Sequence, residues 1–330
     1  MGKQLTIVVP HYKEPFEICH HLFDSIAIQR GIEFDDISVL VVNDGDDVVW
    51  DMSVFEPYPY DVEYVVNEHK GISETRNFGI EHGDSEYIMF CDCDDMFLNN
   101  YALHLLFGAM QEGFNFLHSV FIEEQRDADS GAWTIIRRDR DLVFVHGKCY
   151  RREFLKEKEL RFDPELRLNE DSVFNKIAYH EAGDFVKYIE TPFYLWCWNG
   201  ESTVRKERED FVLKTYDQVM LMRQKVCEQL EERGFIDEYF NSVCQTVFDS
   251  YYDFNEPSFT KKQNRMLRLD AEKAFKRYYR QFSKSFMECD SDRIGTQMMQ
   301  ARLRAYNAGM RVEEIDFKSW IKHIKNDVKA

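Results

Sequence analysis

The chain has 330 residues, of which 44% are hydrophobic, so it can bury a sizeable core in one or two domains and is not intrinsically disordered. Its formal net charge of −18 argues against a protein that coats nucleic acid with its whole surface. We find no signal peptide and no apolar run long enough to cross a membrane, which predicts a cytoplasmic protein, either free or peripheral at the inner face of the membrane.

The N-terminal part of the chain alternates short apolar strands with helices. In chain order we predict a strand at Leu5–Val9, a helix at Pro15–Gln29, strands at Ile37–Val42 and Val62–Val66, a helix at Ile72–His82, a strand at Tyr87–Cys91 and a helix at 102–112. A β-rich stretch follows, with strands at Trp133–Ile136 and Leu142–Val145. This alternation is typical of a mostly parallel sheet covered on both faces, so the sequence predicts an α/β fold with flanking helices.

The character of the chain changes near residue 205, beyond which the pattern is helical. Helices are predicted at 206–233, 236–253, 260–288, 292–308 and 315–328, which divides the chain into domains 1–205 and 206–330. Residues 261–330 contain 17 Lys and Arg against 9 Asp and Glu, a net charge of +8, and residues 1–260 carry the balance of −26. The basic segment is either the solvated face of a helical domain or a surface for an anionic partner.

Three carboxylates follow the predicted strand that contains Phe90, at Asp92, Asp94 and Asp95. Open α/β sheets bind ligands at the carboxyl ends of their strands. Clustered carboxylates repel one another unless a cation or water screens them, and Mg²⁺ or Mn²⁺ prefers oxygen ligands. The segment therefore predicts a divalent metal site, with a solvated turn as the alternative.

Other polar loops follow strand ends at the same edge of the predicted sheet. The first contains Pro10, Tyr12 and Glu14, and the second contains Asp44, a candidate hydrogen-bond acceptor for a base or a ribose. Arg76 lies at the start of the next helix, where free N–H groups and positive charge suit a phosphate. The chain has neither a GxxxxGK[ST] loop nor a GxGxxG motif, so it is not an obvious ATPase or dinucleotide enzyme.

In this order and at this spacing, the segments resemble the family 2 glycosyltransferases of the GT-A fold, over roughly residues 4–205. The matching segments are Ile7–Glu14, Val41–Gly45, Asn67–Gly79 and Phe90–Asp95. The resemblance implies a GT-A fold, followed here by a helical C-terminal region. It also implies a metal-dependent enzyme, using Mn²⁺ or Mg²⁺. Such an enzyme transfers a sugar from a nucleotide sugar, usually a UDP-sugar, to an acceptor hydroxyl with inversion at the anomeric carbon.

The resemblance further implies roles for the residues of the donor site. In chain order these are Pro10, Tyr12 and Glu14 lining the nucleotide pocket, Asp44 at the base, Arg76 near the diphosphate, and Asp92 and Asp94 at the ribose and the metal. The need for a metal also has a physical reason, because a nucleoside diphosphate gains negative charge as it leaves.

An inverting transfer also needs a carboxylate that takes the proton of the acceptor hydroxyl. The segment Asn169–Phe174 resembles the family motif that supplies this base, which makes Asp171 the candidate base and Glu170 the next in line. Acidic residues at the start of a helix, here predicted at Ser172–Ala182, otherwise serve as ordinary N-terminal residues that favour the helix. The upstream resemblance favours catalysis over capping.

The stretch Phe193–Thr203 resembles the aromatic and polar segment that often closes over the donor in this family. Aromatic rings stack well on sugars and bases, and Trp198 is the expected donor contact. Trp196 and Trp198 alternate with Cys197, so we expect both indole rings on one face of a strand, with core packing as the alternative for one of them.

The acceptor is left open by the sequence. We expect a hydroxyl of a glycan, polysaccharide or glycolipid, with the basic helices binding an anionic acceptor or joining copies of the chain into a homo-oligomer. A modified nucleic-acid base is the alternative acceptor. Tyr278, Tyr279 and Phe282 lie among Lys and Arg residues and would stack on bases, but they equally suit the buried face of an amphipathic helix.

Two alternatives come from other classes of protein. A nucleotidyltransferase would carry a Gly-rich, basic loop after the first strand, where this chain has Pro10-His11-Tyr12. A non-catalytic nucleotide-sugar-binding protein would tolerate the loss of the base. Because both the metal motif and the candidate base are present, we expect an active glycosyltransferase.

Overall fold

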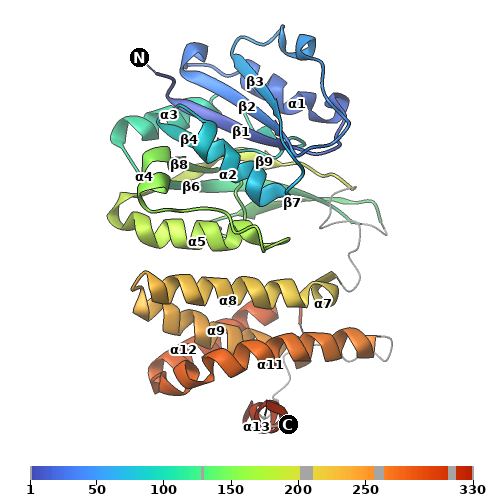
Figure 1. Cartoon of the computed structure of the whole chain (residues 1–330), viewed down its shortest axis with the longest axis vertical. Helices are drawn as coiled ribbons and strands as arrows, with labels where there is room; N and C mark the ends of the chain where they lie inside the picture. The colour runs from blue at the N-terminus through green and yellow to red at the C-terminus, as the bar shows by residue number, and fades with distance from the viewer. Residues whose placement is uncertain (1, 128–129, 201–210, 256–263, 311–316, 329–330) are drawn as a thin grey trace. The chain divides into compact units, whose positions relative to one another are not determined.

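The computed structural model describes residues 2–127, 130–200, 211–255, 264–310 and 317–328, and the chain folds as two compact units, Met1–Gly200 and Glu201–Ala330 (Figure 1). The first unit is a sheet flanked by helices, and the second is helical. The predicted α/β fold followed by a helical region is therefore confirmed. The boundary predicted at residue 205 lies outside the described residues.

One nine-stranded sheet organises the first unit. Its order is β3-β2-β1-β4-β8-β6-β9-β5, and β7 pairs with β6 off this path. The strands are β1 Leu5–His11, β2 Ile37–Asn43, β3 Asp61–Val66, β4 Tyr87–Phe90, β5 Met96–Phe97, β6 Phe116–Arg126, β7 Trp133–Arg138, β8 Lys148–Arg151 and β9 Val186–Trp196.

The parallel pairing predicted for the sheet is found from β3 to β4. There β1 pairs in parallel with β2 and β4, and β2 pairs in parallel with β3. The rest of the sheet is mixed, because β8 runs antiparallel to both β4 and β6, whereas β9 is parallel to β6. The carboxyl ends of β1, β2 and β4 therefore meet at one edge, where the polar loops begin.

Helices cover the sheet because β1 is apolar on both sides, and all seven of its residues are buried. The helices of this unit are α1 Phe16–Ala27, α2 Ile72–His82, α3 Ala102–Glu112, α4 Arg152–Glu157 and α5 Glu170–Ala182. On one face of β1, Leu5, Ile7 and Val9 share a core with α1 and α3. On the other face α2 packs so closely that a Cβ added at Gly79 would meet the Val8 side chain at 2.6 Å.

The strand predicted at Leu142–Val145 is wrong. The chain forms bends and turns there, and the strand in this region is β8 at Lys148–Arg151. The cause is Asp141, whose Oδ1 accepts hydrogen bonds from the backbone N–H groups of Val143 (2.8 Å) and Phe144 (3.0 Å). An Asp that binds the backbone two and three residues ahead bends the chain and keeps these N–H groups out of a strand ladder.

The second unit packs amphipathic helices around an aromatic core. Its described helices are α7 Phe211–Lys214, α8 Tyr216–Glu232, α9 Ile236–Asn255, α11 Arg265–Glu288, α12 Ser291–Asn307 and α13 Phe317–Val328. Tyr278, Tyr279 and Phe282 of α11 are at most 3% exposed, so the core-packing interpretation holds and these rings do not offer a stacking surface for bases. Within the described part of the chain, no helix combines the length and the apolar character needed to cross a membrane.

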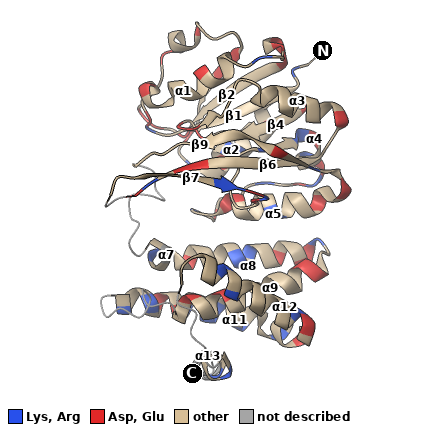
Figure 2. Ribbon diagram, turned by 180° about the vertical axis from the view of Figure 1, so that it is seen from behind, with Lys and Arg blue, Asp and Glu red and all other residues tan. Residues whose placement is uncertain are grey.

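The two units differ in charge. Residues 1–200 contain 18 Lys and Arg against 38 Asp and Glu, whereas residues 201–330 contain 24 against 22. Acidic residues are spread over the first unit, including its loops and helix ends, and the helices of the second unit contain residues of both signs (Figure 2). The large negative charge of the chain therefore belongs to the unit that contains the candidate site.

Candidate active site

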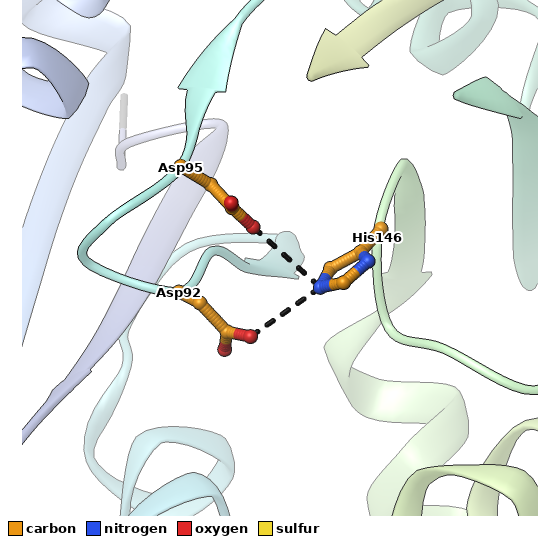
Figure 3. Close-up of side chains that lie close together, drawn as sticks. All are labelled: Asp92, Asp95 and His146. Carbon is orange, nitrogen blue, oxygen red and sulfur yellow. Dashed lines mark hydrogen bonds and ion pairs between the residues drawn. The ribbon is translucent and has the colours of Figure 1, made fainter. Parts of the chain in front are cut away.

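The carboxylate loop after β4 meets a histidine from the turn before β8. Figure 3 shows Asp92 and Asp95 directed toward His146. Nε2 of His146 lies 3.3 Å from Oδ2 of Asp92 and 3.5 Å from Oδ2 of Asp95. Each of the three side chains offers one ligand atom, and these atoms lie within 4.8 Å of one another. The loop therefore gathers groups that can bind a cation.

Asp92 also binds Arg76, which links the loop to α5. Arg76 is buried, and its guanidinium donates to Oε1 of Glu170 (2.6 Å) and to Oδ1 of Asp92 (3.2 Å). Burial disfavours the charged form of Asp92, but His146 and Arg76 outweigh it and hold the pKa of Asp92 well below its ordinary value. Asp92 is therefore an anion at any physiological pH.

Asp95 is a fully buried carboxylate held by the end of β9. Its Oδ2 accepts from the Tyr194 hydroxyl (2.7 Å), and its Oδ1 accepts from the backbone N–H of Cys197 (2.9 Å). Burial, together with the charges of Asp92 and Asp94, raises the pKa of Asp95 well above its ordinary value. Because both oxygens are bonded within the protein, Asp95 fixes the loop and the end of β9 against each other.

Asp94 is less buried than Asp95. It is half-buried, and its Oδ2 accepts a hydrogen bond from Nδ2 of Asn199 (2.7 Å). Burial raises the pKa of Asp94, and the negative charge of Asp92 adds to the effect. A divalent cation beside Asp92 and Asp94 would relieve this repulsion, and their oxygen donors match the preference of Mg²⁺ or Mn²⁺.

The His146 ring is held in place at this loop by aromatic packing. Nδ1 of His146 is buried, and among the described residues it has no hydrogen-bond partner. The ring is instead packed between Phe144 and Tyr194, with ring centroids 5.6 Å and 5.3 Å away. A histidine held this rigidly presents Nε2 to the carboxylates in one orientation, which suits a ligand or a group that positions one.

Asp171 has the opposite electrostatic character to Asp92. It lies in the first turn of α5, half-buried, and its Oδ1 accepts from the backbone N–H of Ser172 (2.9 Å). Burial and the neighbouring negative charge of Glu170 raise the pKa of Asp171 to about 8. A carboxyl group with a raised pKa is a stronger base when ionised, which suits proton transfer near neutral pH.

Glu170 opens α5 and is paired with Arg76. The helix begins at Glu170 rather than at Ser172, and Asn169 before it adopts a left-handed conformation without a side-chain cap. The Glu170 carboxylate is buried against Arg76, so it neutralises that guanidinium. A carboxylate whose charge is stabilised by a paired guanidinium is a weaker proton acceptor than an unpaired one.

The loops after β1 and β2 lie together as predicted, but Asp44 binds backbone. Its Oδ1 accepts from the N–H groups of Lys70 (2.9 Å) and Gly71 (3.1 Å), which fixes the loop before α2. Tyr12 is exposed and stacks on His69, with ring centroids 4.8 Å apart. These contacts fix aromatic and acidic side chains of the two loops at the edge of the sheet.

Pro10, in β1, and Glu14, in the loop after it, lie at the same edge of the sheet. Pro10 is buried within the strand beside Val42. Oε2 of Glu14 accepts from the backbone N–H of Tyr12 (2.7 Å), and burial raises the pKa of Glu14. Pro10 therefore contributes to this edge through the backbone of β1, while Tyr12 and Glu14 contribute their side chains.

The expectation that Trp196 and Trp198 share a strand face is wrong. β9 ends at Trp196, whose ring packs on Phe144 and His146 at 4.8 Å. Trp198 lies beyond the strand, where its backbone N–H donates to Oε2 of Glu124 (3.0 Å) and its ring packs against that of Trp133. The Asp95 carboxylate binds the N–H of Cys197 between them, which ends the ladder and turns the chain.

Sequence reasoning left several residues of the site without a role. These are Asp95, His146, Tyr194 and Asn199. Asp95 belongs to the carboxylate run itself, so it had a local signal. Tyr194 and Asn199 lie in the stretch Phe193–Thr203, which resembles the closing segment of the family, but their pairing with Asp95 and Asp94 had no local signal, because these partners are 99 and 105 positions away in the sequence.

Comparison with known proteins agrees with this architecture. A family model described as Glycosyl transferase family 2 matches residues 6–193, which is more than half of the chain. The chain belongs to glycosyl transferase family 2. The family and the fold that the sequence resemblance implied are therefore confirmed.

Relatives of this family 2 chain share part of their length with it. EpsJ of Bacillus subtilis (strain 168), named as an uncharacterized glycosyltransferase, is 28% identical over 223 residues, which cover 60% of this chain and 62% of EpsJ. The match thus spans less than two thirds of that relative.

Solved structures resemble nearly the whole chain. S. aureus TarS 1–349 in complex with UDP-GlcNAc has a TM-score of 0.55 at 17% identity over 95% of each chain. The mannosyltransferase PcManGT from Pyrobaculum calidifontis, in complex with GDP-Man and Mn²⁺, has a TM-score of 0.50 at 14% identity, over 98% of this chain and 85% of that one. At these identities the likeness is one of fold.

Proposed function

We propose that this family 2 chain transfers a sugar from a nucleotide sugar, with a UDP-sugar as donor, to a hydroxyl of a glycan, polysaccharide or glycolipid, with inversion at the anomeric carbon. Asp92 and Asp94 bind the donor through a divalent metal, and Asp171 takes the proton of the acceptor hydroxyl. Tyr12, Glu14 and Asp44 form the nucleotide side of the site.

The observation that carries the proposal is the contrast between two carboxyl groups. The pKa of Asp92 is held below its ordinary value by His146 and Arg76, against the effect of burial, whereas burial and Glu170 raise the pKa of Asp171 to about 8. Arg76 stands between the two segments, in contact with Asp92 and Glu170. Titratable groups whose environments push their pKa values apart are typical of sites that separate charge binding from proton transfer.

Mn²⁺ or Mg²⁺ is the proposed cofactor. When bound, the ion supplies positive charge that stabilises the nucleoside diphosphate as it leaves. The residues that would hold it are Asp92 and Asp94, with His146 and Asp95 either completing the ligand set or orienting Asp92. Solved structures of similar fold that contain UDP-GlcNAc, or GDP-Man with Mn²⁺, support this choice of donor and ion.

The test is donor cleavage with product identification. The full chain is incubated with UDP-glucose, UDP-GlcNAc, UDP-galactose and GDP-mannose, with Mn²⁺ or with EDTA, and the released nucleotide is resolved by ion-exchange chromatography. We expect slow, metal-dependent release of a nucleoside diphosphate, with water as the substitute acceptor. Release of pyrophosphate from nucleoside triphosphates instead would indicate a nucleotidyltransferase, and binding without any release would indicate a non-catalytic binding protein.

Paired variants separate the metal loop from general effects on the strand. Asp94→Ala should abolish metal-dependent release. Glu86→Ala, which removes an exposed carboxylate just before β4, at the opposite end from the loop, should leave it unchanged. Equal losses in both variants would contradict the assignment of the metal to the loop.

A further inference from the structure

We infer that the β6–β7 hairpin carries a binding platform for a carbohydrate acceptor, made by the indole rings of Trp133 and Trp198. The platform would receive a sugar ring of the acceptor beside the donor site. This inference rests on the proposed function, because it names the class of molecule that the glycosyltransferase modifies. It also moves Trp198 from the donor side, where the sequence resemblance put it, to the acceptor side.

Two tryptophans from distant parts of the chain meet at this point. The rings of Trp133 and Trp198 have centroids 6.4 Å apart and lie nearly perpendicular, at 83°. Trp133 is 57% exposed although it begins a strand paired in register with β6. The Arg126 guanidinium, opposite Trp133 in the ladder, lies 5.6 Å from the centre of the Trp133 ring. The geometry gives a corner in which the Arg126 guanidinium lies over the partly exposed Trp133 ring and the Trp198 ring stands nearly perpendicular to it.

The exposed apolar surface continues along the same face of β7. Side chains alternate along a strand, so Trp133 and Ile135 share a face, and both are more than half exposed. The opposite face is engaged, since Arg138 pairs with the buried Glu123. Among the described strands β7 pairs only with β6. A Trp and an Ile left adjacent and exposed form a patch of the kind that marks an interaction site.

The patch is joined to the carboxylate loop by a short segment. The backbone N–H of Trp198 donates to Oε2 of Glu124 in β6 (3.0 Å), which holds Trp198 beside the hairpin. The next residue, Asn199, donates to Oδ2 of Asp94 (2.7 Å). One peptide therefore separates the platform from a residue that contacts the proposed metal loop.

The order of strands places the platform on the side where an acceptor must approach. The loops that bear Tyr12 and Asp44 follow β1 and β2, which lie on one side of β4 in the sheet, whereas β6, β7 and β9 lie on the other side. A nucleotide that occupies the first side, with its diphosphate at the loop after β4, directs its sugar toward the second. The acceptor hydroxyl must meet that sugar, so its binding surface belongs to β6, β7 and β9.

The chemistry of the patch favours a sugar ring over a lipid surface. An indole face packs well against the C–H groups of a pyranose, while charged groups such as Arg126 and Glu124 at its border suit hydroxyls. The neighbouring Arg137 and Asp139 on the same hairpin are also charged and exposed. A patch with two tryptophans and an isoleucine inside a polar border is small for membrane insertion but is sized for one or two sugar units.

The experiment uses the full chain, labelled with a fluorophore, on a printed array of microbial and synthetic glycans in the presence of Mn²⁺ and UDP. We expect the wild type to bind a subset of glycans, Trp133→Ala to lose about tenfold in affinity for that subset, and Trp133→Phe to retain most of it. Tyr101→Ala is the matched control, since Tyr101 is an exposed aromatic residue of the same unit, outside the hairpin, and should change nothing.

Three results would overturn the inference. These are no glycan bound by the wild type, unchanged binding by Trp133→Ala, and a change in oligomeric state on substitution of Trp133, which would make the patch a contact between copies of the chain. UDP binding, measured in parallel by calorimetry, keeps the proposals separate. Normal UDP binding together with glycan binding that does not depend on Trp133 would contradict the platform alone. Absence of nucleotide binding by the wild type would contradict the proposed function.

Discussion

The two units bury charge in opposite ways. In the sheet unit, Asp92, Asp95 and Glu170 crowd around Arg76 and His146, and the pKa values of Asp94, Asp95 and Asp171 are raised because burial and like charges oppose ionisation. In the helical unit, Arg223 faces Asp249 at 3.7 Å, and the Tyr216 hydroxyl donates to Asp253 at 3.2 Å, so these two acidic residues have an opposite charge or a hydrogen-bond donor as partner.

This difference indicates that the sheet unit has a lower folding free energy than it could have, because its buried carboxyl groups serve binding and catalysis. Like charges held together cost folding free energy, and they persist where a ligand or a reaction uses them. Matched charges inside a helical core serve the fold itself. Removing one of the carboxyl groups with a raised pKa in the first unit should therefore lower activity and raise stability, whereas substitutions in the second unit should change stability alone.

The largest expected effect is on turnover in Asp171→Asn. Removing a general base lowers the rate by about 10²–10⁴-fold, and the amide keeps the shape of the side chain. Initial rates of nucleoside diphosphate release with the best donor measure it. Wild-type turnover in this variant would place the base elsewhere.

The next largest effect is on stability in Arg76→Met. The substitution leaves Glu170 and Asp92 without their shared cation, and breaking a buried ion pair in this way costs about 3–5 kcal/mol of unfolding free energy. Urea denaturation measures the loss, and adding Glu170→Gln should recover part of it. Lys187→Met, which breaks a surface pair with Glu112, is the control and should cost about 0–1 kcal/mol.

Asp171→Asn should also make the protein more stable above neutral pH. The folded pKa of Asp171 is raised to about 8 from an ordinary value of 3.8, so the folded chain binds more protons than the unfolded chain between these values. The contribution of Asp171 to the unfolding free energy is therefore fully present below pH 3.8, decreases as the pH rises, and reaches its minimum above pH 8. Thermal unfolding of both proteins at pH 4 and pH 8.5 tests this, with equal midpoints at pH 4 and a higher midpoint for the variant at pH 8.5.

The pH dependence of kcat/KM provides a kinetic counterpart. Because the base must be ionised to accept a proton, kcat/KM should rise with pH and level off above about 8 in the wild type. The residual activity of Asp171→Asn should lack this rise. A profile that is flat from pH 6 to 9 in the wild type would contradict a raised pKa at the base.

The smallest effect is expected in the helical unit. The Tyr279 hydroxyl of α11 is buried and, among the described residues, has no hydrogen-bond partner. Tyr279→Phe removes this unsatisfied group, so the unfolding free energy should stay the same or rise by about 1–3 kcal/mol, with turnover unchanged. A loss of turnover would mean that the second unit contributes directly to the chemistry.

Much of the fold could be predicted from local patterns. The fully buried β1, the helix α2 and the carboxylate run after β4 have a local periodicity or composition that predicts them without knowledge of the rest of the fold. The false strand at Leu142–Val145 shows the limit, because a single Asp141 side chain redirects an apolar run through two hydrogen bonds. Strand order beyond β4 depends on long-range pairing that no local pattern records.

The residues of the candidate site likewise fall into those with a local sequence signal and those identified only by long-range contacts. Asp92, Asp94 and Asp171 could be selected because they lie in short motifs with a chemical reason for their spacing. The pairing of Arg76 with Glu170 and of Tyr194 with Asp95 could not, since each joins residues 94 or 99 positions apart. Asp44 illustrates a third case, in which the residue was found but its carboxylate proves to bind the backbone of a neighbouring loop.

The central claim is that donor binding and proton transfer reside on different carboxylates. Calorimetric titration of the best UDP-sugar in Mn²⁺ into the wild type, Asp94→Ala and Asp171→Asn tests it most directly. We predict that Asp94→Ala loses Mn²⁺-dependent affinity by about 10–100-fold, while Asp171→Asn binds the donor like the wild type. Normal donor binding by Asp94→Ala, or equal losses in both variants, would contradict the account.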